Sequence, residues 1–163
     1  MSPHLKDRAA ALLRAFEERK WMIATAESCT GGLVSSLLTE IPGSSAVVER
    51  GFVTYSNEAK SEMLGVPAGL IGTHGAVSEP VARAMAEGAL AHSRANVAVS
   101  ITGVAGPGGG SDAKPVGLVH FALAQEGRET RALERRYGDP GRQEIRARAV
   151  EDALGLLESA LDA

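Results

Sequence analysis

One residue of this sequence that could act as a nucleophile is a serine in a short polar segment. Ser28 stands in the segment AESCTGG, residues 26–32, directly after the apolar run WMIATA at residues 21–26. We interpret the apolar run as a buried strand and residues 33–40 as a helix, which places Ser28 at the carboxyl end of a strand. Ligands commonly bind at that end in open α/β sheets. Ser28 is therefore a candidate nucleophile.

The residues that follow Ser28 predict a site for negative charge. The first amides of a helix have no partner within it, and the helix dipole favours an anion there. The backbone N–H groups near Thr30, Gly31 and Gly32 could therefore hold an oxyanion or a phosphate. In the alternative interpretation, Ser28 or Thr30 only caps the helix.

A lysine at the start of another predicted helix is the candidate base. The segment YSNEAK, residues 55–60, leads into a short helix expected over residues 58–64, with Ser56-Asn57 as its N-cap. If Asn57 is the N-cap, the helix dipole favours loss of the Lys60 proton by only about 0.3–1 kcal/mol. A lysine pKa of about 7–8 needs roughly 4 kcal/mol, so Lys60 serves as a base only if it is also desolvated or close to another cation. Otherwise it is a surface lysine paired with a neighbouring glutamate.

A glycine-rich segment offers a second place for an anion. Residues 102–110, TGVAGPGGG, contain five glycines, among them Gly103, Gly106 and Gly109. Glycines let backbone amides approach a ligand closely and form an anion-binding concavity. The segment has neither the Walker A pattern nor the dinucleotide-binding fingerprint. A flexible loop after a strand is the alternative.

Two arginines at the start of the last predicted helix, Arg142 and Arg146, stand one turn apart. Residues four apart lie on the same helix face, so this pair could clamp a phosphate. Arginines on a helix face are usually solvated, and a solvated pair is the alternative.

The cysteine and the histidines offer less chemistry. The chain has one cysteine, Cys29, which excludes an internal disulfide and a zinc site with several cysteine ligands. Cys29 has no base in its own motif, so we interpret it as a small core residue, with a cysteine nucleophile as the alternative. His74, His92 and His120 show no metal-ligand spacing. We expect no metal and no cofactor.

Composition is typical of a globular protein. The 163 residues suffice for one domain with a sizeable core, and 44% of them are hydrophobic and 23% charged. A net charge of −3, with one Trp, two Tyr and three Phe, argues against a nucleic-acid surface. The N-terminus does not resemble a signal peptide, and no apolar run approaches the roughly 20 residues that span a bilayer. We expect a cytoplasmic protein with a small-molecule substrate and no nucleic-acid or membrane partner.

Hydrophobic periodicity predicts an alternation of helices and strands. Helices are expected over residues 5–20, 33–40, 58–64, 79–93 and 142–161, with Ser78 as one N-cap. Strands are expected over residues 21–26, 46–55 and 96–101, and a hairpin over residues 116–124 and 129–137. Strands joined by both helices and a hairpin predict a single α/β domain over residues 1–163, three-layer α/β/α with a mixed sheet covered by helices on both faces.

Several long motifs, taken in their order, resemble the C-terminal domain of CinA, the competence/damage-inducible protein. The motifs are AESCTGG, YSNEAK, PGSS at residues 42–45, HGAVSEPVARAMAEGA at residues 74–89, and SITGVAGPGGG followed by KPVG within residues 100–117. The resemblance covers nearly the whole chain. This domain also occurs as a stand-alone nicotinamide mononucleotide amidohydrolase. The resemblance therefore implies the fold of that family and hydrolysis of the carboxamide of nicotinamide mononucleotide to nicotinic acid mononucleotide and ammonia.

The resemblance also implies roles for individual residues. Ser28 matches the nucleophile, Lys60 its general base, Tyr55 a phenol in the same network, and Thr102 the threonine of a loop that lines the site. These roles suit the chemistry, because hydrolysis of a carboxamide needs an activated hydroxyl, a base and donors to an oxyanion. The family forms dimers or higher oligomers and requires no metal.

One segment departs from the family pattern. Many relatives have a compact Gly-Asp-Arg before the last helix, where this chain has GDPGR at residues 138–142. The departure leaves open whether Arg142 or Arg146 takes the phosphate, and whether it serves its own site or that of a neighbouring subunit. Some stand-alone members are inactive, so a catalytically silent nucleotide-binding or regulatory module, linked to competence or DNA damage, is the alternative function.

Overall fold

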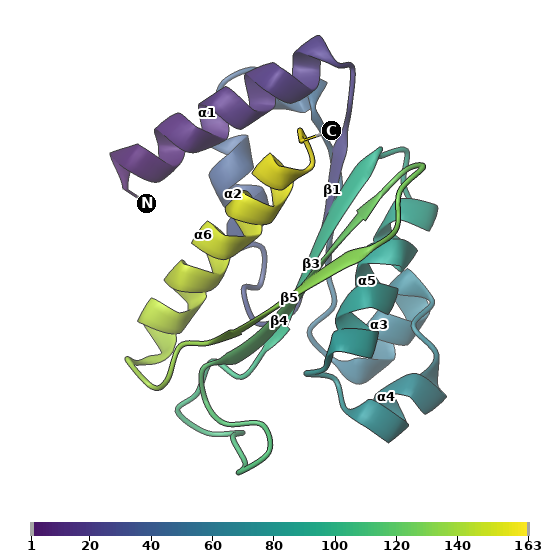
Figure 1. Cartoon of the computed structure of the whole chain (residues 1–163), viewed down its shortest axis with the longest axis vertical. Coiled ribbons are helices and arrows are strands. Elements are labelled where there is room, and N and C mark those ends of the chain that lie inside the picture. Colours follow the sequence, from purple (N-terminus) through teal and green to yellow (C-terminus); the bar gives the residue numbers. More distant parts are fainter. Residues whose placement is uncertain (1, 163) are drawn as a thin grey trace.

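A mixed sheet lies between two layers of helices in the computed structural model, which describes residues 2–162 (Figure 1). The sheet has five strands in the order β2-β1-β3-β4-β5. The parallel strands are β1 (Ile23–Glu27), β2 (Val48–Val53) and β3 (Val97–Gly103). The antiparallel hairpin of β4 (Leu118–Gln125) and β5 (Arg131–Arg136) extends the sheet beyond β3. The predicted three-layer α/β/α fold with a mixed sheet is confirmed.

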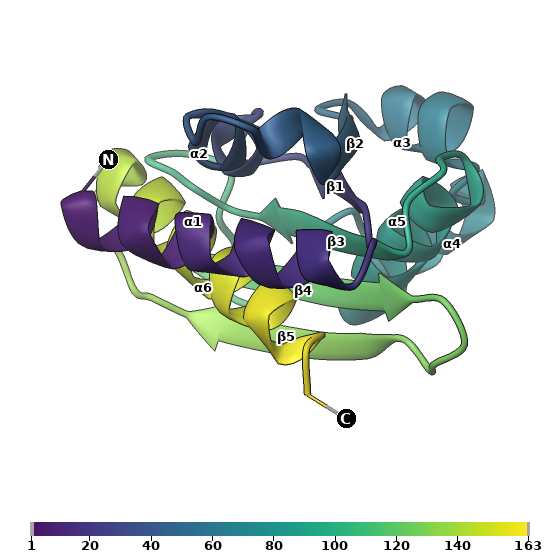
Figure 2. The ribbon, with the colours of Figure 1, turned by 90° about the horizontal axis from the view of Figure 1, so that it is seen from above.

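The helices divide into two groups of three, one on each face of the sheet (Figures 1 and 2). One face carries α1 (Pro3–Glu18), α2 (Leu33–Thr39) and α6 (Arg142–Ser159). The other carries α3 (Asn57–Leu64), α4 (Ala68–His74) and α5 (Glu79–Ala91). A short 3-10 turn, Ser44–Ala46, precedes β2.

The central strand β1 supplies residues to both helical layers. Successive side chains of a strand point to opposite faces. Ile23 packs in the cluster with α1, α2 and α6, whereas Ala24 and Ala26 pack in the cluster with α3, α4 and α5. Small side chains at these two positions let the second layer approach the sheet closely. The same alternation sends the side chains of Glu27 and Ser28 in opposite directions.

The structure corrects two details of the sequence prediction. The segment AGLIGTH, for which the sequence predicted no helix or strand, forms α4 between Pro67 and Gly75. The N-cap of α3 is Ser56 rather than Asn57, because the Ser56 hydroxyl accepts from the Ala59 amide at 3.0 Å. Lys60 is therefore the fourth residue of its helix, where the helix dipole acts still more weakly.

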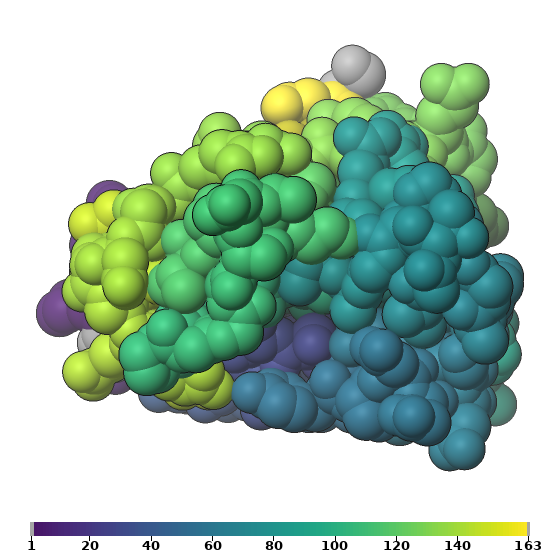
Figure 3. All heavy atoms as spheres, turned by 90° about the horizontal axis from the view of Figure 1, so that it is seen from below, coloured from purple at the N-terminus to yellow at the C-terminus, as the bar shows by residue number. Residues whose placement is uncertain are grey.

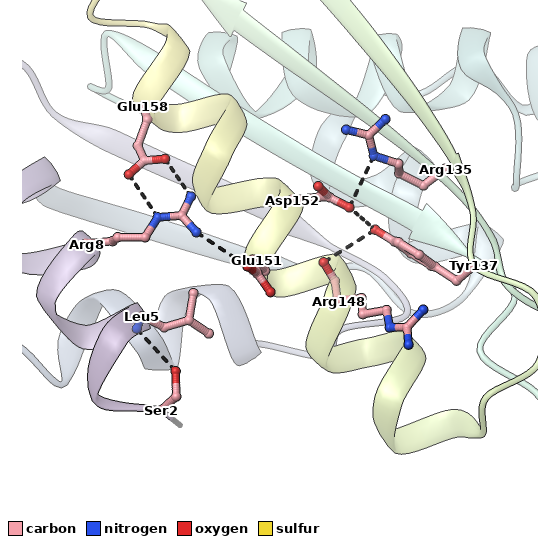
Figure 4. A network of polar contacts seen from close by, with 9 residues as sticks. All are labelled: Ser2, Leu5, Arg8, Arg135, Tyr137, Arg148, Glu151, Asp152 and Glu158. Carbon is pink, nitrogen blue, oxygen red and sulfur yellow. Dashed lines mark hydrogen bonds and ion pairs between the residues drawn. The ribbon is translucent and has the colours of Figure 1, made fainter.

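Polar contacts on both sides of α6 fix that helix across the sheet (Figure 4). Arg8 of α1 donates to both carboxylate oxygens of Glu158, at 3.2 and 2.6 Å. Asp152 accepts from Tyr137, just after β5, and from the Arg135 guanidinium at 3.3 Å. These contacts hold α6 so that its first residue, Arg142, lies beside the loop that follows β3.

Candidate active site

A cavity of about 210 Å³ opens at the end of the sheet where β1 and β3 end. Figure 3 shows this end of the molecule, with atoms of the β1–α2 region (dark violet) in a hollow between the loop after β3 (green) and the α3 and α4 segments (blue and teal). Its lining residues are Ser28, Cys29, Tyr55, Asn57, Lys60, Ala76, Val77, Thr102, Gly103, Ala105 and Arg142. Within the described residues, this lining holds the Arg142 guanidinium and no carboxylate, which suits an anionic ligand.

The Lys60 amine and the Ser28 hydroxyl meet inside this cavity. Lys60 Nζ lies 3.1 Å from Ser28 Oγ, and only 1% of the lysine is exposed. The amine also donates to the carbonyl oxygens of Thr54 at 2.9 Å and Tyr55 at 3.3 Å. Carbonyls only accept, whereas a hydroxyl both donates and accepts. A neutral Lys60 amine can therefore donate to both carbonyls and direct its lone pair at the Ser28 hydroxyl.

Burial acts on Lys60 in the same direction as the helix dipole. Desolvation lowers the pKa of the Lys60 amine below its usual value of 10.5, because burial disfavours the charged form. The alternative of a solvated surface lysine is wrong. Lys60 thus combines contact with the Ser28 hydroxyl and a lowered pKa, two features that a general base for Ser28 would need.

Neither Ser28 nor Thr30 caps helix α2, so the capping interpretation is wrong. The N-cap position is Gly32, which has no capping side chain. The first amides of the helix instead donate to the buried carboxylate of Glu27, from Val34 at 2.9 Å and from Ser35 at 3.0 Å. The helix start that the sequence predicted as an anion site is thus occupied by a side chain of the protein.

The backbone of the loop from Ser28 to Gly32 leaves other amides unpaired. The Gly31 amide donates to the Ser28 carbonyl at 3.0 Å, so it is not free for a ligand as the sequence suggested. Among the described residues, the amides of Cys29, Thr30 and Gly32 find no protein acceptor. Of these three residues, Cys29 lines the cavity, so its amide is the candidate donor to an oxyanion next to the Ser28 hydroxyl.

Arg142 connects two segments at the rim of the cavity. Its guanidinium donates to the Gly106 carbonyl at 2.8 Å and to the Tyr55 phenol oxygen at 3.1 Å. The Tyr55 side chain is 63% exposed. A guanidinium has five N–H donors, so Arg142 keeps donors for an anion after making these two bonds.

Thr102 and Gly103 form the part of the wall that β3 contributes. The buried Thr102 hydroxyl donates to the Ala76 carbonyl at 2.9 Å and thereby fixes the segment between α4 and α5 against the strand end. At Gly103 a Cβ atom would lie 2.7 Å from Val119 Cγ2, so the close approach of β4 requires glycine there.

Arg146 lies behind the serine loop rather than in the cavity. Its guanidinium donates to the carbonyls of Cys29 at 3.1 Å and Thr30 at 3.3 Å. Of the two arginines, the cavity thus includes Arg142, and Arg146 braces the loop. The other predicted site residues absent from the lining are Thr30, Gly31, Gly32, Gly106 and Gly109.

Sequence reasoning missed several residues of the site. Asn57, Ala76, Val77 and Ala105 line the cavity, and Glu27 lies beneath it. Asn57, Ala76, Val77 and Ala105 all lie within motifs that resemble the family, and Asn57 and Ala105 also stand beside predicted site residues. Ala76 and Val77 are apolar and carry no chemical signal.

Cys29 is unsuited to act as the nucleophile. The thiol is 5% exposed, and burial raises its pKa to about 12. A thiol with this pKa is almost entirely protonated at neutral pH, whereas the thiolate is the reactive form. Within residues 2–162 no cluster of three or more His, Cys, Asp or Glu side chains could hold a metal ion. None of the helices there is long and apolar enough to cross a membrane.

Fold and site together define a three-layer α/β protein with a buried Ser–Lys pair at the carboxyl end of its parallel strands. The family described as the CinA C-terminal domain matches residues 5–161, and the chain belongs to that family. A CinA-like protein of Anaeromyxobacter dehalogenans is 53% identical over 158 residues, which cover 96% of this chain and 37% of the relative. A CinA-like protein of Syntrophus aciditrophicus is 50% identical over 161 residues, covering 98% and 37%. The chain thus spans about a third of the length of these curated relatives.

Solved structures agree with this membership. The competence/damage inducible protein CihA from Agrobacterium tumefaciens is similar with a TM-score of 0.97 and 52% identity, over 100% of this chain and 98% of that one. The competence damage-inducible protein A from Klebsiella pneumoniae is similar with a TM-score of 0.91 and 36% identity, over 97% and 98%.

Proposed function

We propose that this domain is an amidohydrolase that converts nicotinamide mononucleotide to nicotinic acid mononucleotide and ammonia. The observation that carries the proposal is the contact of 3.1 Å between Lys60 Nζ and Ser28 Oγ at a position where the lysine is buried. A hydroxyl beside a desolvated amine is one of the arrangements that can catalyse acyl transfer from an amide.

The first half of the reaction forms an acyl-enzyme. Ser28 Oγ attacks the carboxamide carbon while its proton passes to neutral Lys60. The resulting oxyanion accepts a hydrogen bond from the unpaired Cys29 amide at the cavity. Lys60 then returns the proton to the amide nitrogen, the C–N bond breaks, and ammonia leaves.

The second half restores the serine. Water attacks the ester carbon while Lys60 takes one of its protons, and the C–O bond to Ser28 breaks as the proton moves to Ser28 Oγ. The product is the carboxylic acid, which releases its remaining proton to water and becomes the carboxylate of nicotinic acid mononucleotide. In each half of the reaction Lys60 first accepts a proton and then returns it. One desolvated amine can therefore serve as both base and acid.

The shape and charge of the cavity support a nucleotide substrate. Its volume of about 210 Å³ is below the roughly 300 Å³ at which pockets for whole small ligands begin. We propose that the pyridine carboxamide occupies the cavity and that the ribose phosphate extends to Arg142 at the rim. Arg142 holds the phosphate in this arrangement, Tyr55 orients Arg142, and Thr102 keeps the wall in place.

The test is release of ammonia from nicotinamide mononucleotide by the purified protein. We expect turnover in the wild type and a loss of at least about 100-fold in Ser28→Ala and in Lys60→Ala. Calorimetry with the nucleotide should show that Ser28→Ala still binds it. Nucleotide binding without ammonia release by the wild type would support a silent binding module instead, and turnover by Ser28→Ala would contradict the mechanism.

A further inference from the structure

Glu27 has no role in the proposed reaction, yet both members of the Ser–Lys pair are connected to it. It is the last residue of the central strand β1, and its side chain is fully buried. Its carboxylate contacts the loop that carries Ser28, and its main chain contacts the segment that holds Lys60. A buried charge is expensive unless it is fully hydrogen-bonded.

The carboxylate of Glu27 holds the serine loop from the side opposite to Lys60. Glu27 Oε1 accepts from the Thr30 hydroxyl at 2.6 Å and from the Val34 amide at 2.9 Å, and Oε2 accepts from the Ser35 amide at 3.0 Å. All three partners are donors, so this arrangement suits a carboxylate. One side chain thus fixes the end of the loop, through Thr30, and the start of α2 that follows it.

The main chain of Glu27 fixes the segment that holds the base. The Thr54 amide donates to the Glu27 carbonyl at 2.9 Å, and the Thr54 carbonyl accepts from Lys60 Nζ at 2.9 Å. Ser28, the next residue, donates its amide to the Ile101 carbonyl of β3 at 2.9 Å. The position of Ser28 relative to Lys60 is therefore set through residue 27.

Arg146 binds hydrogen-bond acceptors of the same loop, whereas the Glu27 carboxylate binds a donor. Its guanidinium takes the carbonyls of Cys29 and Thr30, while Glu27 takes the Thr30 hydroxyl. With the carbonyls held by a cation, the amides of Cys29 and Thr30 remain unpaired among the described residues. Together these three contacts hold the loop in one conformation, in which these amides stay unpaired.

We propose that Glu27 is a positioning residue of this site, whose carboxylate locks the loop of residues 28–32 in the conformation that aligns Ser28 with Lys60. This inference rests on the proposed function for its effect on turnover, but the locking itself is independent of any substrate. Glu27 touches no reacting atom.

Two variants separate the carboxylate from the rest of the structure. Thr30→Val removes the hydroxyl that donates to Glu27 and leaves both α2 amides in place. Glu27→Gln keeps the size of the side chain but replaces one acceptor oxygen by an NH2 group that faces a donor. Thr25→Val is the matched control, because Thr25 is equally buried and its hydroxyl contacts the same helix, at Ser35 Oγ, without touching the loop.

Alkylation of Cys29 by iodoacetamide reports on the loop without any substrate, because this is the only cysteine of the chain and its thiol is buried within the loop. We expect labelling, followed by mass spectrometry, to be about tenfold faster in Thr30→Val and in Glu27→Gln than in the wild type. Thr25→Val should stay within about threefold of the wild type. Rates that do not change with low concentrations of urea identify local opening rather than global unfolding.

Kinetics then test whether the locked loop matters for turnover. A misplacement of about 1 Å costs about 100-fold in rate. We therefore expect kcat to fall about tenfold or more in both variants. KM should stay within about threefold of the wild-type value, and the midpoint of the pH profile should not change. Labelling of both variants at the rate of Thr25→Val would overturn the locking, and an unchanged kcat would overturn its role in turnover. If the wild type releases no ammonia, the proposed function fails while the labelling rates still decide the locking.

Discussion

Lys60 and Ser28 lie 32 positions apart in the sequence, yet the amine of one is 3.1 Å from the hydroxyl of the other. The strand β1 ends one residue before Ser28, and α3 places Lys60 in its second turn, so two separate elements must be packed correctly to form the pair. The predictions below test the chemistry of this contact and the surroundings that maintain it.

The activity should depend on the protonation state of Lys60. Only the neutral amine accepts the Ser28 proton, and burial lowers the pKa of Lys60 below 10.5. We expect kcat/KM to rise with pH through the folded pKa and to level off before pH 10.5. In Lys60→Arg the guanidinium stays protonated, and activity should fall by at least about 100-fold at every pH. Initial rates between pH 5 and 10 provide the test, and a flat profile in the wild type would contradict it.

The same lysine should make stability depend on pH. The folded pKa of Lys60 is lowered, so the unfolded chain binds more protons between the folded pKa and 10.5. Stability therefore rises with pH through that window and falls as the pH drops toward the folded pKa. Lys60→Met has no proton to bind, so its Tm should change less with pH over the same range. Parallel Tm curves for the two proteins would show that Lys60 is not desolvated in the folded state.

Cys29 should be dispensable for catalysis. Burial raises the pKa of its thiol to about 12, so little thiolate is available as a nucleophile. We expect Cys29→Ala to retain kcat within about threefold and to lose about 1 kcal/mol of stability from the small cavity left behind. Ammonia release and chemical unfolding measure the two effects. Loss of activity in a folded Cys29→Ala protein would instead favour a cysteine mechanism.

Arg142 should contribute to binding of the phosphate. We expect Arg142→Gln to raise KM for nicotinamide mononucleotide by about 10-fold or more, because the substitution removes a charge-assisted contact. Activity on nicotinamide riboside, which lacks the phosphate, should change much less.

Arg148→Gln is the matched control for this prediction. Arg148 lies on the same helix and pairs with Glu144 at 3.0 Å on an exposed face. An equal rise of KM for the nucleotide and the nucleoside in Arg142→Gln would show that Arg142 shapes the cavity without holding the phosphate.

Gly103 should be sensitive to any side chain. A Cβ there would lie 2.7 Å from Val119 Cγ2 and 3.0 Å from the Leu118 carbonyl oxygen, so Gly103→Ala should destabilise the fold by about 1–3 kcal/mol. A Cβ at Gly108 would meet no atom within 4 Å, and Gly108→Ala should leave stability within about 1 kcal/mol. Equal values of Tm for the two variants would contradict this close packing against β4.

Local patterns in the sequence predicted the fold and marked Ser28 and Lys60 as candidates, whereas their roles as a pair were implied by the resemblance to the family. Apolar runs, capping residues and glycines mark where strands end, and reacting groups of α/β proteins lie at strand ends. Ser28, Lys60, Thr102 and Arg142 all stand within one residue of such an end or in the first turns of a helix. Motif order supplied the remaining assignment to the family.

The contacts that hold the site residues in place were not predictable from local patterns. Helix-capping rules look for a side chain at the residue before the helix, whereas α2 is capped by Glu27, which belongs to the preceding strand. The burial of Lys60 depends on where the chain from Thr54 to Tyr55 passes, which is a tertiary feature. Arg142 and Arg146 share a helix face, but one helical turn of about 5.4 Å places only the first at the cavity.

Because Lys60 is buried in the folded chain, its amine loses its hydration water before any substrate binds. The carbonyls of Thr54 and Tyr55 belong to the same chain as the amine, so folding itself removes water from the base. In the proposed mechanism the base therefore forms without a closing lid and without the use of substrate binding energy. Small amides that fit the cavity would meet the same reactive serine as a full nucleotide, so selectivity among them would rest on affinity and not on activation.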